Sequence, residues 1–155
     1  MNETDKEKTD RQLGELLNEL RVALPGAQVL LAFLLTAPFQ AQFVRATHTE
    51  RTVLFAGVML TGMGVLLLLA PSVYHRVRWG EGGKTDVVRV GHRFFLAGTA
   101  GLTLGLLCAT FVVADFLFGG VLAIAAVVSL LGLVALTWYL LPLERGRDPR
   151  VRRQE

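Results

Sequence analysis

Four long runs of uncharged residues interrupt this chain and decide what it can fold into. They lie between Arg21 and Arg45, Arg51 and Arg76, Arg93 and Asp115, and Asp115 and Glu144, and contain 23, 24, 21 and 28 residues. A helix needs about 20 apolar residues to cross the hydrocarbon layer of a bilayer. Because lipid cannot satisfy unpaired backbone N–H and C=O groups, each run is expected to cross as an α-helix.

The predicted fold class is an all-α membrane protein, a four-transmembrane-helix bundle preceded by an N-terminal amphipathic interfacial helix. The spans are predicted at residues 24–44, 53–74, 94–114 and 116–141, within a membrane domain of residues 24–143. Residues 1–10 are polar and are expected to be disordered, and residues 144–155 form a basic tail. Gly119 and Gly120 permit a sharp turn between the last two spans.

The distribution of Lys and Arg predicts the orientation, because basic residues resist translocation. The N-terminal segment, the loop between the second and third spans, and the tail together carry fourteen of the sixteen Lys and Arg residues. The other two, Arg45 and Arg51, lie in the first loop. Both termini are therefore expected on the cytoplasmic side.

A leucine pattern precedes the first span. Leu13, Leu16, Leu17, Leu20 and Leu24 have the spacing that places apolar groups on one face of a helix. This predicts an amphipathic cytoplasmic helix over residues 11–23 that Pro25 and Gly26 would break or bend. It would either lie on the membrane surface or dock a partner or another subunit.

The basic tail has two interpretations. Five arginines between residues 144 and 155 fix the topology of the last span, and they could also attract anionic lipid headgroups. The sequence pI near 9.5 reflects these cytoplasmic flanks, so no nucleic-acid partner is expected. The lipid bilayer is the expected partner.

A stripe of small residues marks the third span. Ala97, Gly101, Gly105 and Ala109 are four residues apart and would let another helix approach closely. The stripe would hold the bundle together or form the contact of a homo-oligomer.

A polar stripe marks the first span. Gln28, Thr36 and Gln40 are separated by eight and four residues, and Pro38 is close by. The amides could form hydrogen bonds between helices, with Pro38 kinking the helix. Alternatively, they could line a hydrated groove in which a carbonyl freed by Pro38 coordinates a cation.

The sequence gives little support for an enzyme, and we expect no catalytic residues, cofactor or metal site. Within the predicted spans there is no Asp, Glu, Lys, Arg or His, which proton relays in membranes normally need. The sole cysteine, Cys108, lies in the middle of a span and is expected to pack rather than react. His75 and His92 flank the basic loop without a carboxylate cluster, and Asp115 is expected to cap a helix or fix topology.

The sequence resembles a known family in two segments. These are ELLNELRVALPGAQV followed by FLLTAPF within residues 15–39, and residues 70–76. They are similar to an uncharacterised bacterial family of small four-span integral membrane proteins, a domain of unknown function in which some members carry the label sodium/proton antiporter. The resemblance covers residues 15–141 and implies the four-span fold and a location in the bacterial cytoplasmic membrane.

The resulting functional expectation is a non-enzymatic structural or regulatory membrane component. The alternative is a small-cation channel or transporter of the antiporter type.

Overall fold

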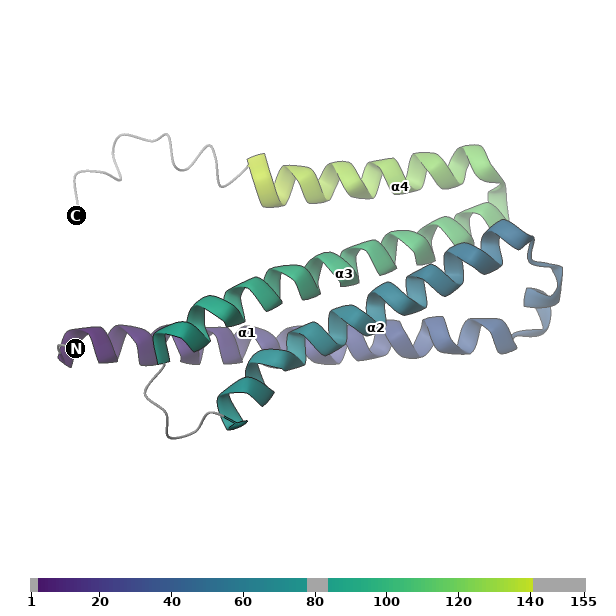
Figure 1. The fold of residues 1–155 in the computed structure, drawn as a ribbon. Helices are drawn as coiled ribbons and strands as arrows, with labels where there is room; N and C mark the ends of the chain where they lie inside the picture. The colour runs from purple at the N-terminus through teal and green to yellow at the C-terminus, as the bar shows by residue number, and fades with distance from the viewer. Residues whose placement is uncertain (1–2, 78–83, 141–155) are drawn as a thin grey trace. The chain divides into compact units, whose positions relative to one another are not determined.

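The computed structural model describes residues 3–77 and 84–140, and almost all of them are helical (Figure 1). The elements are α1 (Glu3–Thr36), the 3₁₀ turns η1 (Ala37–Phe39) and η2 (Ala41–Arg45), α2 (His48–Val77), α3 (Lys84–Phe118), α4 (Gly120–Ala135) and the π-helical turn η3 (Leu136–Leu140). No strand occurs among the described residues. The all-α class predicted from the sequence is confirmed. The basic tail at 144–155 lies outside the described residues.

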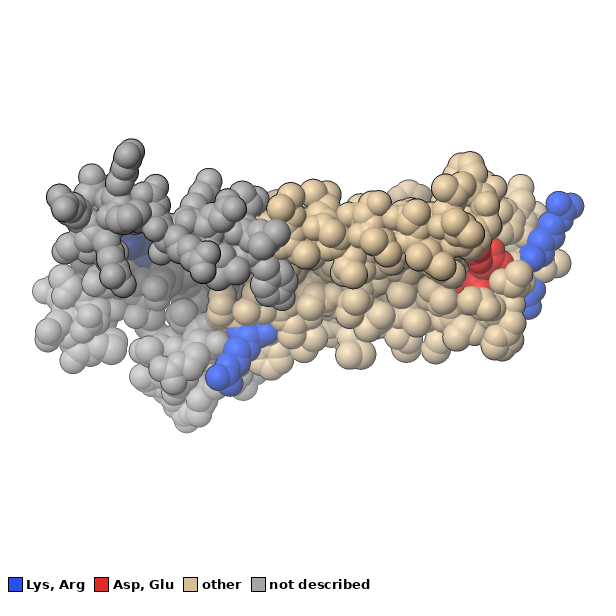
Figure 2. All heavy atoms as spheres, turned by 90° about the horizontal axis from the view of Figure 1, so that it is seen from above, with Lys and Arg blue, Asp and Glu red and all other residues tan. Residues whose placement is uncertain are grey.

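Four helices within the described residues are long and apolar enough to cross a membrane. The apolar segments are Asn18–Phe39, His48–Pro71, Gly91–Phe118 and Gly120–Trp138. In the space-filling view the described residues are mostly uncharged, and few Lys, Arg, Asp or Glu side chains are visible among them (Figure 2). The sequence predicted four helices of this kind, which is confirmed, while the bounds of all four differ from the predicted ones by three to six residues.

The N-terminal helix does not stop at Pro25. Residues 11–23 are helical as predicted, but α1 continues through Pro25 and Gly26 as one element of 34 residues. It also begins at Glu3, so residues 3–10, which the sequence predicted to be disordered, are helical. A proline removes one backbone hydrogen bond, whereas ending the helix inside an apolar segment would leave several groups unpaired.

The first apolar helix ends earlier than predicted, at Thr36 rather than Val44. Pro38 gives the reason, because its ring would clash with the carbonyl group of Leu34 and disfavours the α conformation at Ala37. The chain continues in 3₁₀ turns, and Gln40 adopts an extended conformation (φ −74°, ψ 138°). Gln40 therefore lies beyond the helix and not on its polar stripe.

A capping box starts α2. The backbone N–H and the hydroxyl group of Thr47 donate to Glu50 Oε2 at 2.6 and 2.9 Å, and the backbone N–H of Glu50 donates to Thr47 Oγ1 at 3.2 Å. This reciprocal arrangement satisfies donors that a helix start leaves unpaired. It explains why the carboxylate of Glu50 is buried, with 4% of the residue exposed.

The chain divides inside α3 into two compact units, Met1–Ala109 and Thr110–Glu155. In the first unit, α2 runs beside both α1 and α3 (Figure 1). On α1 the buried residues Leu20, Ala27 and Leu34 are seven residues apart. This heptad spacing keeps one side of a helix against a neighbour over several turns.

In the second unit, Gly119 separates α3 from α4. It has φ +87° and ψ 167°, a conformation that is essentially restricted to glycine. The N–H of Gly119 donates to the carbonyl oxygen of Asp115 at 2.9 Å. The predicted turn is therefore present, but residues 116–118 belong to α3 rather than to the fourth span, because no helix-breaking residue precedes Gly119.

Candidate functional site

In the first unit, the backbones of α2 and α3 come into close contact at glycines. A methyl group on Gly64 would lie 2.8 Å from the carbonyl oxygen of Gly98 and 3.0 Å from the backbone nitrogen of Leu102. A methyl group on Gly101 would lie 3.0 Å from the carbonyl oxygen of Leu60. Since these neighbours are backbone atoms, no side-chain rotation could relieve the contact. The glycines let the helices pack backbone to backbone.

The small-residue stripe predicted on the third span is only partly the one that packs. Gly101 and Gly105 face α2, whereas Ala97 is exposed and Ala109 is half-buried. Besides Leu102, the α3 residues that contact α2 include Gly98, Gly101, Gly105 and Cys108. Their spacing of three, four and three residues keeps to one side of a helix with a 3.5-residue period, which is typical of left-handed packing. Residues spaced strictly by four move progressively around the helix and leave that side.

The α2 face follows the same rule, with Gly57, Thr61, Gly64 and Leu68 spaced by four, three and four residues. Gly57 touches both neighbouring helices, because a methyl group there would lie 3.0 Å from Cβ of Cys108 and 3.9 Å from Cδ2 of Leu34. Cys108 therefore has a packing role at this contact, as the sequence predicted.

Thr61 is the polar residue at the centre of this contact. It is fully buried, and its hydroxyl oxygen has no hydrogen-bond partner among the described residues. A methyl group on Gly105 would collide with this oxygen. A Cα–H of Gly105 therefore faces the oxygen, which is the arrangement of a weak Cα–H···O contact between helices.

The predicted polar stripe of the first span does not come together as one surface. Gln28 and Thr36 both lie on α1 and both are exposed, while Gln40 lies in the following loop. The hydroxyl group of Thr36 donates to the carbonyl oxygen of Phe33 at 2.9 Å, so its own helix satisfies it. Gln28 has no hydrogen bond from its side-chain amide to any described residue.

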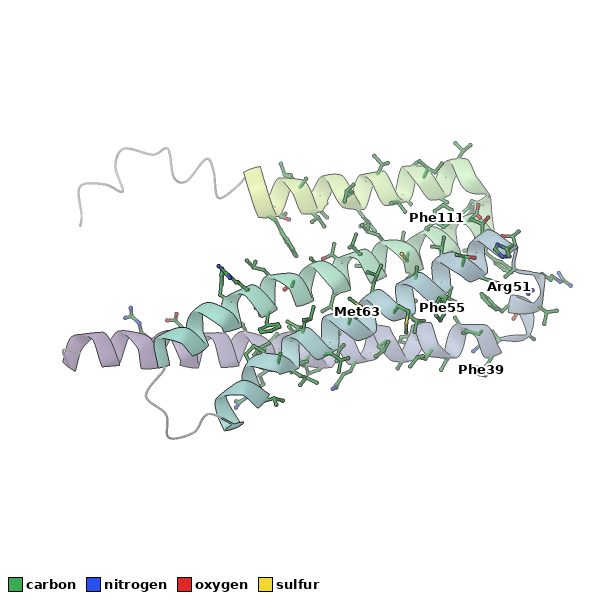
Figure 3. The ribbon with its side chains drawn as sticks, in the orientation of Figure 1. Phe39, Arg51, Phe55, Met63 and Phe111 are labelled. Atoms are coloured by element: carbon green, nitrogen blue, oxygen red, sulfur yellow. The ribbon has the colours of Figure 1, made fainter. Side chains whose placement is uncertain are left out.

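Carbonyl groups in the 3₁₀ turns that follow α1 already have donors. The backbone nitrogens of Gln40, Phe43 and Ala46 donate to the carbonyl oxygens of Ala37, Gln40 and Phe43. The guanidinium group of Arg51 donates to the carbonyl oxygen of Val44 at 3.0 Å, and Arg51 and Phe39 lie at the same end of the helices (Figure 3). A cation beside these carbonyls would meet the positive charge of Arg51.

Other hydroxyl groups within the apolar helices bond to their own backbone. Thr103 donates to the carbonyl oxygen of Thr99 at 2.9 Å, Ser129 to that of Ala125 at 2.7 Å, and Thr137 to that of Leu133 at 2.9 Å. Such bonds satisfy a polar group in lipid without a second helix. Each of these hydroxyl groups therefore donates its hydrogen bond within its own helix.

The sequence reasoning missed the capping box and the true register of the α2–α3 contact. The Thr-x-x-Glu signature at residues 47–50 could have revealed the capping box. His92 is exposed, and no group of three His, Cys, Asp or Glu side chains able to hold a metal ion occurs in the described part of the chain.

A family model described as a family of unknown function (DUF6328) matches residues 2–142 of the chain. Comparison with curated proteins finds no match, and comparison with solved structures finds none either.

Proposed function

The chain belongs to the DUF6328 family, whose function is unknown, and we propose that it is a multi-pass membrane protein with a non-enzymatic structural or regulatory role. The observation that carries this proposal is the backbone-to-backbone contact of α2 and α3 around Gly64, Gly98 and Gly101. At this contact the two helices fill the space between them, which an ion path or a ligand pocket would have to occupy. The hydroxyl groups bonded to their own helices support the same reading.

The lipid bilayer is the proposed surrounding of these helices. Large apolar side chains are exposed along them, among them Phe33 at 71%, Phe55 at 65% and Met63 at 59% (Figure 3 labels the last two). Exposed apolar surface on this scale would be unfavourable in water and is favourable in lipid. We place the protein in the bacterial cytoplasmic membrane with both termini in the cytoplasm, because fourteen of sixteen basic residues lie on that side.

Ion flux tests the proposal against the alternative of a small-cation channel or transporter. The purified chain is reconstituted in proteoliposomes, and Na⁺, K⁺ and H⁺ fluxes are recorded with and without a pH gradient. Protein-free vesicles give the baseline, and a K⁺ ionophore verifies that the vesicles are sealed. We expect fluxes equal to the baseline in every condition.

A cation flux above the baseline would contradict the proposal. The double variant Gln28→Leu, Gln40→Leu then decides the route, because these are the amides that a groove along the first span would use. Loss of flux in a folded double variant would support the groove. Unaltered flux would exclude it.

A further inference from the structure

Gln28 is a polar side chain at the middle of the first apolar helix. The segment runs from Asn18 to Phe39, so ten of its 22 residues precede Gln28 and eleven follow it. At about 1.5 Å per residue, this position is roughly at the midplane of the bilayer that we propose for the chain. Gln28 is exposed there.

An amide at this depth needs a partner. Its side chain has two N–H donors and a carbonyl acceptor, and lipid offers none in return. Around Gln28 the backbone of α1 is engaged in its own helix, and the described residues provide no hydrogen bond to the Gln28 side chain. The partner must therefore come from outside the contacts already present.

The surface around Gln28 is shaped for a close neighbour. Pro25 and Ala32, one turn before and one turn after, are exposed residues without long side chains. The bulky Phe33 points well away from them, since five residues correspond to about 140° around the helix. A second helix could therefore approach the amide over Pro25 and Ala32, and it would meet Leu35, which is exposed on the same side two turns further on.

The sequence limits what that neighbour can be within this protein. Apart from Asn18 at the end of its segment, Gln28 is the only Asn or Gln in the apolar segments, and no charged residue lies near their centres. The hydroxyl groups of α4, on Ser129 and Thr137, donate to their own helix. Among the described residues no second amide lies at this depth, whereas another copy of the chain provides one.

We propose that the chain forms a homodimer in which the α1 helices of two copies meet at Gln28. All copies insert with one orientation, so a two-fold axis along the membrane normal brings identical residues together at equal depth. An amide is self-complementary, because each side chain can donate one N–H to the carbonyl oxygen of the other. This inference rests on the membrane placement in the proposed function and names the partner as a second copy.

Disulfide crosslinking beside an intact Gln28 tests the dimer. The variant Cys108→Ala removes the sole native thiol, and Ala32→Cys introduces one on the proposed interface. Proteoliposomes at a high lipid-to-protein ratio are oxidised with copper phenanthroline and run on non-reducing gels. We expect a crosslinked dimer for Ala32→Cys, and monomer for the matched control Phe33→Cys, which is exposed on another side of α1.

Adding Gln28→Leu to the Ala32→Cys variant tests the amide itself. The substitution is present in both copies and removes both hydrogen bonds of the amide pair, so association should weaken by about tenfold to a thousandfold, at about threefold to thirtyfold for each bond in lipid. The lipid dilution at which half of the dimer is lost should shift by that factor. Monomer from Ala32→Cys at every dilution would overturn the dimer, and an unshifted midpoint with Gln28→Leu would overturn the role of the amide.

The outcomes also separate this inference from the proposed function. A monomer that inserts normally and conducts no ions would remove the dimer and leave the proposed function standing. A chain that does not insert into the bilayer would remove both.

Discussion

Substituting Gly64 with alanine should force α2 and α3 apart. The added methyl group would lie 2.8 Å from the carbonyl oxygen of Gly98 and 3.0 Å from the backbone nitrogen of Leu102. The first distance is shorter than Cβ contacts allow and the second is at their lower limit, and both neighbours are backbone atoms. The helices must separate by several tenths of an ångström over the whole contact, and overpacking of this kind costs about 1–3 kcal/mol.

Gly62→Ala is the matched control for this substitution. Gly62 lies on the same helix, and a methyl group there would meet nothing within 4 Å. Both variants gain the same helix propensity, which is worth about 0.5–1 kcal/mol for glycine to alanine. The difference between them therefore isolates the clash.

Reversible unfolding in mixed micelles measures this difference. The protein is titrated with SDS in a mild detergent, and the loss of α2–α3 contact is followed by energy transfer between dyes on the two helices. The free energy of unfolding should be lower for Gly64→Ala than for Gly62→Ala by about 1–3 kcal/mol. Equal stabilities would refute the backbone-to-backbone contact.

Three further substitutions test other features by the same unfolding assay. Thr61→Val removes a buried hydroxyl group that has no conventional hydrogen-bond partner, at nearly constant shape, and should stabilise the protein by about 1 kcal/mol, since burying an unsatisfied polar group is unfavourable; a large destabilisation would show that the contact of this hydroxyl group with Gly105 is strongly favourable. Thr47→Ala removes the cap of α2 and should cost about 0.5–2 kcal/mol, with Thr47→Ser close to the native protein as control. Gly119→Ala places a side chain at φ +87° and should cost about 1–3 kcal/mol, whereas Gly120→Ala meets only the Asp115 carboxylate at 3.6 Å and should be tolerated.

The apolar helices could be predicted from the sequence because charge and hydropathy alone decide which segments lipid accepts. The turn before α4 was equally visible, since a non-helical conformation was needed within residues 115–120 and Gly119 provides it. Helix ends depended on finer effects. Pro25 and Pro38 look alike in the sequence, yet α1 continues through Pro25 and ends just before Pro38. Charge and hydropathy do not distinguish the two prolines.

The candidate sites were harder to predict because they depend on which helix lies opposite. A spacing of four residues selected Ala97 and Ala109 on the third span, but contact with α2 follows a 3.5-residue period and uses Gly98 and Cys108 instead. The sequence of one helix cannot reveal this register without the helix that packs against it. The same reason explains why Gln28 was grouped with Gln40, which the structure places beyond the end of the helix.

Reporter fusions test most directly whether these helices cross a membrane as proposed. Alkaline phosphatase, which is active only outside the cytoplasm, is fused after Ala46 in the loop between α1 and α2, and in a second strain after Glu155. We expect high phosphatase activity after Ala46 and none after Glu155, with both fusions in the membrane fraction. Activity after Glu155, or recovery of either fusion in the soluble fraction, would contradict the membrane placement and the orientation.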